Sequence, residues 1–311
     1  MIDRLNLQHE VGFHGKFDLC RESLGWTDNS HACATDKFHM TKYERTELAR
    51  SWVCPRNYTF HTVRANGKAD ATIMAAKIYK ADSPRNAQRI VDEDIVAVAR
   101  VLSTVVTGKL QSIIIPIFRD MDAELAASPV SIDCQSGCHY CCHYHVTVSA
   151  AEAFAIAEHL RAIPGGTGAS LLAKLAATAE RVAHLTEAQY LVTNIPCAFL
   201  DGGHCTIYEV RPLACRGHHA MRVDVCQRTF EDPTSHELST LDAVRQQVHV
   251  GYKSALQFGE HLAGLDATLY ELHGAVKEAV ENSASFRRWK SGKVAFPSVR
   301  DRVSLAEALR V

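Results

Sequence analysis

Four cysteines crowd into residues 134–142, with the spacing C-x3-C-x2-C-C. They are Cys134, Cys138, Cys141 and Cys142. A thiolate is a soft anionic ligand, and several in one short loop can converge on a single metal centre. Gly137 gives the loop backbone freedom to fold tightly. Buried cysteines that merely fill a core would have apolar neighbours, but Gln135, Ser136 and several histidines surround these. We therefore interpret this first motif as a set of metal ligands.

A second motif follows at residues 196–216, where three more cysteines, Cys197, Cys205 and Cys215, lie among glycines and prolines. Arg211 and Arg216 flank the last of them. A cation near a thiolate stabilises the charged form and lowers the pKa of the thiol. These arginines would offset the negative charge of a thiolate-rich centre, or they are ordinary surface salt-bridge partners.

Seven cysteines exceed the four ligands of a tetrahedral zinc site. Three arrangements fit the count: a four-thiolate iron–sulfur cluster with supporting cysteines, two metal ions that divide the ligands, or one zinc ion with extra redox-active thiols. The adjacent pair Cys141 and Cys142 point in different directions in most backbone conformations. One of the two can therefore be a ligand while the other is not.

The two motifs together resemble the YkgJ-type cysteine-cluster family, described as zinc- or iron-chelating. Its pattern, CxxxCxxCC followed by PC-x-x-L…C-x-I-Y-x-x-RP-x-x-C-R, is matched by the cysteines above and by Pro196, Leu200, Ile207-Tyr208 and Arg211-Pro212. The resemblance covers about residues 130–220. It implies metal or iron–sulfur binding, with Tyr208, Arg211 and Arg216 beside the cofactor.

For the ligands, we expect Cys134, Cys138, Cys141 and Cys215 first, with Cys142, Cys197 and Cys205 in supporting or alternative roles. A flagellin lysine methylase has a similar cysteine motif and is taken to carry an iron–sulfur cluster. This analogy and the surplus of thiols favour a [4Fe-4S] cluster, with Zn²⁺ or mononuclear or dinuclear iron as alternatives.

The reaction stays open among three hypotheses. The first is a cluster used for redox chemistry or to modify a peptide or small molecule. The second is a zinc or iron chelating or delivery protein without catalysis. The third is a radical S-adenosylmethionine-like enzyme, suggested by the spacing of Cys134, Cys138 and Cys141 with Tyr140 before the third cysteine. Nearby histidines are possible additional ligands: His139, His143, His145, His204, His218 and His219.

Composition limits the partners and the cellular location that we expect for this protein. The 311 residues carry 34 basic and 35 acidic side chains, so no nucleic-acid partner is expected. No apolar run reaches the roughly 18 residues of a membrane span, and the N-terminus lacks the apolar region of a secretory signal. Eleven cysteines without an export signal indicate reduced thiols and a cytoplasmic protein. The partner would be an unidentified peptide, protein or small molecule.

The remaining chain predicts a mainly α protein, with helices around a central irregular, cysteine-rich module. We divide it into an irregular N-terminal arm (1–69), a helical region (70–129), the cysteine-cluster domain (130–228) and a C-terminal helical region (229–311). Ser83-Pro84 is expected to start a helix, Ser149 and Glu152 form a capping box, and 164–168 reads as a turn before a helix over 169–190. Ser239–Asp242 and Ser304–Glu307 signal further helix starts.

Overall fold

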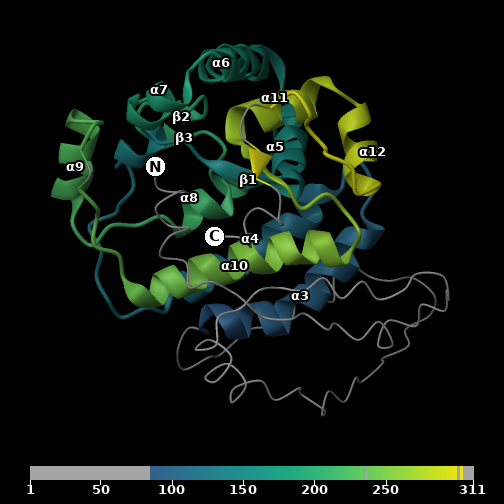
Figure 1. Cartoon of the computed structure of the whole chain (residues 1–311), viewed down its shortest axis with the longest axis horizontal. Helices are drawn as coiled ribbons and strands as arrows, with labels where there is room; N and C mark the ends of the chain where they lie inside the picture. The colour runs from purple at the N-terminus through teal and green to yellow at the C-terminus, as the bar shows by residue number, and fades with distance from the viewer. Residues whose placement is uncertain (1–84, 236, 300–301, 304–311) are drawn as a thin grey trace, which may run out of the picture. The chain divides into compact units, whose positions relative to one another are not determined.

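The structure is a computed structural model that describes residues 85–235, 237–299 and 302–303 (Figure 1). The predicted N-terminal arm and the helix expected after Ser304 lie outside these residues. The predicted mainly helical fold is confirmed. In the described part the α-helices are α3 (Ala87–Thr104), α4 (Leu110–Ala126), α5 (Ala150–Ala162), α6 (Gly165–Ala183), α7 (Glu187–Val192), α8 (Leu213–Gly217), α9 (Val223–Glu231), α10 (Ala243–Leu262), α11 (Leu272–Glu281) and α12 (Ala284–Lys290).

Helices α3 and α10 pack along each other (Figure 1). Glycines on α10 make the close approach possible, because a Cβ on Gly251 would lie 2.8 Å from Ile90 and one on Gly259 would lie 2.5 Å from Val98. Both facing side chains are buried. Two helices that the sequence places in different regions, 70–129 and 229–311, are thus in direct contact.

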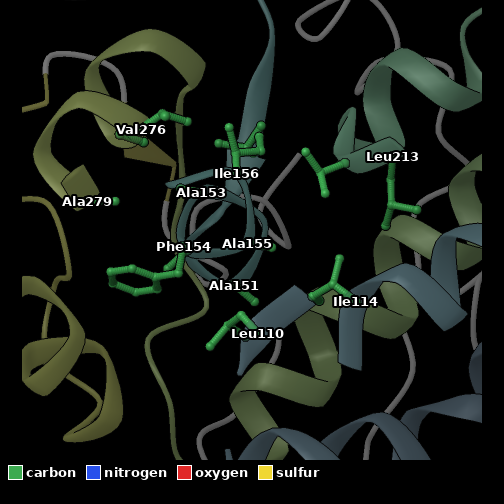
Figure 2. Packing of buried hydrophobic residues seen from close by; sticks show 14 of the residues in the cluster. Leu110, Ile114, Ala151, Ala153, Phe154, Ala155, Ile156, Leu213, Val276 and Ala279 are labelled. Atoms are coloured by element: carbon green, nitrogen blue, oxygen red, sulfur yellow. The ribbon is translucent and has the colours of Figure 1, made fainter. Parts of the chain in front are cut away.

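Helix α5 is buried on almost every side, which its alanine-rich sequence allows. Leu110 and Ile114 of α4 lie on one side of it, and Val276 and Ala279 of α11 lie on another (Figure 2). The predicted capping box is confirmed at its start: the Ser149 hydroxyl accepts from the Glu152 backbone, and the Glu152 carboxylate accepts from the Ser149 backbone. This rigid helix follows the first cysteine motif directly.

Short antiparallel strands tie the C-terminal region to the segment after the first motif. Strand β1 (Thr147–Ser149) pairs with β4 (Leu269–Glu271), with Thr147 opposite Glu271. Strand β4 also pairs with β5 (Arg302–Val303), and β2 (Leu200–Asp201) forms a hairpin with β3 (His204–Cys205). All strand pairs in the described residues are antiparallel.

Several helix boundaries differ from the sequence prediction. The helix start expected at Ser83-Pro84 lies outside the described residues, and the first described helix begins after Asn86, whose side chain accepts from the Arg89 backbone N–H at 2.9 Å. The predicted turn over 164–168 is wrong, because extended Pro164 caps α6 and the glycines form its first turn. The single helix predicted over 169–190 is divided into two, with Thr186 starting α7 through its own capping box.

Helix α10 also starts later than predicted. Its cap is Asp242 and not Ser239, because the Asp242 carboxylate accepts from the backbone N–H groups of Val244 and Arg245. The shift matters for the site, because Asp242 also contacts the segment that follows α8.

Candidate metal centre

Backbone hydrogen bonds join the two cysteine motifs. The Cys197 N–H donates to the Cys142 carbonyl at 2.8 Å, and the Ile195 N–H donates to the His143 carbonyl at 3.3 Å. Cys141 and Cys142 lie in a 3-10 helix, η3 (Tyr140–His143). The tip of the β2–β3 hairpin reaches the first loop, since a Cβ on Gly203 would be 3.5 Å from the Gly137 carbonyl oxygen. Loops about sixty residues apart in sequence therefore meet in one place.

Cys215 is positioned by a buried carboxylate. It lies in the five-residue helix α8, which is too short to be stable by itself. Glu152 accepts from the Leu213 N–H at 2.8 Å through one oxygen and from the Ser149 N–H at 2.8 Å through the other. One side chain therefore caps both α5 and α8, and it fixes the second motif to the helix that follows the first.

All seven predicted ligands interact electrostatically in one continuous neighbourhood. The charge of Cys138 raises the pKa of the Cys134 thiol, and the charges of Cys134 and Cys215 raise that of Cys141. The charges of Cys142, Cys197 and Cys205 raise the pKa of Cys215. The structure thus brings the two motifs together, while the role of these cysteines as ligands of one centre stays a prediction. Cys134 is exposed and the other six are half-buried, so the group lies near the surface.

Burial and mutual repulsion oppose ionisation of most of these thiols. The hydrogen bond to Cys142, together with burial, raises the pKa of Cys141. Burial raises the pKa of Cys205 to about 11 and that of Cys215 well above its ordinary value. Cys142 is the exception: the hydrogen bond with Cys141 and the charge of Arg211 lower its pKa to about 7. Several thiolates can coexist here only if a cation supplies compensating charge.

The donor set is all sulfur, which suits zinc or an iron–sulfur centre. Within residues 85–235, 237–299 and 302–303, however, no three cysteine, histidine or carboxylate side chains converge in a way that could hold one ion. The thiols fit a metal centre by their chemistry and proximity, while their final convergence would accompany binding.

Arg211 lies beside the thiols, and its charge favours the ionised forms of Cys142, Cys205 and Cys215. Its guanidinium carbon is 4.2 Å from the centroid of the Tyr208 ring, which is itself 60% exposed. The Nε of Arg211 is buried without a hydrogen-bond partner. The pair forms a cationic, partly exposed rim beside the cysteines.

Arg216 makes a different set of contacts. Its guanidinium bonds Asp122 and the carbonyls of Tyr208, Glu209 and Arg211, and it stacks 4.5 Å from the Phe118 ring centroid. The side chain is buried. These contacts connect α8 and the 3-10 helix η4 (Tyr208–Val210) to α4, so Arg216 braces the second motif.

The nearby histidines are mostly engaged in other contacts. His219 bonds the Gly217 carbonyl and the Asp242 N–H through its two ring nitrogens. His143 packs against Phe230 with ring centroids 4.7 Å apart. His145 stacks on Tyr190 at 3.4 Å, and burial lowers its pKa to about 4. His139 packs against Tyr140 and Phe230, although its Nδ1 has no partner. His204 pairs with Asp201 across the hairpin, and His218 lies edge-on to Tyr144.

Sequence reasoning missed three residues of this neighbourhood. Cys226, buried on α9, interacts with Cys134, and its sulfur is 3.5 Å from the Ser239 hydroxyl. His273, at the start of α11, lies near Cys197, and Glu271 at the end of β4 bonds the His273 ring. Cys226 could have been found from its place just after the second motif. The other two carried no local signal, because they come from a distant region of the chain.

The fold and the sulfur cluster define a helical protein with a cysteine-based metal-binding domain. Residues 133–240 match the family model CxxCxxCC, described as "Putative zinc- or iron-chelating domain". The matched residues contain both cysteine motifs, so the family model agrees with the resemblance that these motifs carry. No curated protein and no solved structure matches the chain. Among the described helices, none has the length and apolar character needed to cross a membrane.

Proposed function

We propose that this chain binds a polynuclear iron centre, a [4Fe-4S] cluster, through cysteines of both motifs. The observation that carries the proposal is the meeting of seven thiols around the Cys197–Cys142 hydrogen bond. The charge of Cys215 acts on the Cys141 thiol across the two motifs, so both belong to every ligand set that we consider. Four thiolates suffice for such a cluster, and the remaining cysteines would support it.

The number of thiols favours a cluster over one zinc ion. A zinc site takes four ligands at about 2.3 Å from one point, and the seven cysteines of the two motifs exceed that number. A cluster, whose irons are each bound by one thiolate, accommodates a wider ligand set.

The placement near the surface supports redox exchange or a cluster-dependent modification. Half-buried sulfurs allow a peptide, protein or small molecule to approach, and the exposed Tyr208 ring with Arg211 offers a contact beside them. The same exposure at Cys134 is compatible with delivery of zinc or iron to another protein, our second candidate. The antiparallel pairing of the described strands gives no support to the radical S-adenosylmethionine alternative.

The identity of the metal tests the proposal. The chain would be purified without oxygen and analysed for iron, inorganic sulfide and zinc, together with an absorption spectrum. Iron and sulfide in about equal amounts, with a broad sulfur-to-iron band, are expected. Colourless protein with stoichiometric zinc would contradict the cluster and indicate a zinc site. Protein without any metal would contradict both proposals.

A further inference from the structure

A buried carboxylate and imidazole approach the cysteine group from outside the matched domain. Glu271 and His273 are both almost fully buried, at 2% and 5% exposure. They lie in β4 and at the start of α11, whereas the family model ends at residue 240. The pairing of Glu271 with Thr147 across β4 and β1, and the Leu272 N–H bond to the Val146 carbonyl at 2.9 Å, hold them beside the first motif.

The Glu271 carboxylate holds the His273 imidazole in one orientation. One oxygen of Glu271 lies 2.8 Å from His273 Nδ1 and also accepts from the His273 backbone N–H at 3.0 Å. The other oxygen accepts from the Gly274 N–H at 2.6 Å. Because Glu271 also caps α11, it cannot rotate away without uncovering that helix end. The imidazole is thereby held with Nε2 pointing away from the carboxylate.

His273 Nε2 faces the second motif. It accepts a hydrogen bond from the Ala198 backbone N–H at 3.2 Å, directly after Cys197 in the chain. Phe199 stacks on the same imidazole, with ring centroids 6.1 Å apart. The Cys197 backbone is fixed as well, by its bond to Cys142 and by the Leu200 N–H, which donates to the Cys197 carbonyl. The backbone at Cys197 and at the following residue is therefore fixed.

We propose that Glu271 and His273 are a positioning pair that fixes the Cys197–Ala198 backbone and thereby orients the Cys197 sulfur toward the metal centre. A carboxylate that orients an imidazole next to a metal site is a general outer-shell device, and loss of such a partner typically weakens metal binding by about 10- to 100-fold. This inference rests on the proposed metal binding. It adds that the centre is completed by the C-terminal region and does not belong to residues 133–240 alone.

The test replaces His273 by glutamine in the full chain, with His261→Gln on the exposed end of α10 as the matched control. Metal release from the purified protein to a chelator is followed, and so is the sulfur-to-metal absorption band. Co²⁺ replaces the native metal if that metal is zinc. We expect release about tenfold faster and a shifted band, because the Cys197 sulfur is no longer held in one orientation at the metal.

A band shift separates positioning from simple loss of stability, because altered folding alone leaves bound sulfur unchanged. If His273→Gln does not fold, Glu271→Gln is the second variant: its remaining oxygen still caps α11, and the same shift is expected in smaller size. Release and band equal to those of the His261→Gln control would overturn the positioning role while metal binding stands. A wild-type chain that binds no metal would instead defeat the proposed function.

Discussion

The carboxylate of Glu152 accepts the backbone N–H of Leu213 at 2.8 Å, and this bond links the helix after the first cysteine motif to the short helix that carries Cys215. The helix that carries Cys215 has no side-chain cap from its own N-cap residue, Pro212. This buried acid thus helps to set the relative position of the two motifs, together with the backbone bonds between them.

Replacement of Glu152 by alanine should therefore destabilise the protein strongly. The change leaves two buried N–H groups, of Ser149 and Leu213, without their acceptor, and each such loss costs about 1–3 kcal/mol. We expect the free energy of unfolding, measured by denaturant titration, to fall by about 2–5 kcal/mol. Glu180→Ala, on the exposed face of α6, is the control and should change it by less than about 0.5 kcal/mol. Equal effects of the two substitutions would contradict the double-capping role.

Gly217, at the end of α8, should not tolerate a side chain. A Cβ there would lie 2.3 Å from the buried His249 ring. The buried His249 ring cannot easily move aside for this Cβ. Gly217→Ala should therefore destabilise the chain by about 1–3 kcal/mol and reduce its metal content. Gly166→Ala, in the first turn of α6 with no atom within 4 Å, should be neutral or slightly stabilising. The melting temperatures of the two variants measure the difference, and only that of Gly217→Ala should fall clearly below wild type.

His249 predicts a pH dependence of stability. Burial, together with the nearby Lys253, His218 and His219, lowers its pKa well below the ordinary value. As pH falls below about 6.5, the unfolded chain binds a proton that folded His249 does not, so the free energy of unfolding decreases, by up to about 1.4 kcal/mol per pH unit.

The variant His249→Asn lacks this titrating group. Between pH 6.5 and 5, its free energy of unfolding should therefore change less steeply with pH, by the contribution of one proton. Part of the slope should remain, because the pKa of His145 is also lowered, to about 4. Denaturant titrations at several pH values measure the difference. An unchanged slope in the variant would show that His249 titrates normally in the folded chain.

Arg211 should strengthen metal binding at neutral pH. Its charge favours the thiolates of Cys142, Cys205 and Cys215, and a metal must displace the protons of its thiol ligands. Arg211→Met is expected to weaken binding about tenfold at pH 7 and less at pH 9, since one pKa unit corresponds to about tenfold. Arg211→Lys, which keeps the charge, serves as the control in the same chelator competition. Equal losses for both variants would assign Arg211 a packing role.

The sequence allowed the local features of this protein to be predicted, but not the distant contacts. The cysteine spacing and the Ser149–Glu152 capping box depend on neighbours a few residues apart, so both could be recognised. The β1–β4 pairing uses three-residue strands with no clear alternation, and it joins segments that are remote in the chain. The approach of His273 to Cys197 follows from that pairing, and so it could not be predicted from local patterns.

The central claim is that both motifs hold one centre, and paired cysteine variants test it most directly. Cys141→Ser and Cys215→Ser would be purified without oxygen beside wild type, with Ser170→Ala, at an exposed position of α6, as the control that we expect to leave metal content unchanged. Metal per chain should fall to a similar small fraction in both variants, because Cys141 and Cys215 interact in the same neighbourhood. Full metal content in either variant, with loss confined to the other motif, would contradict the account.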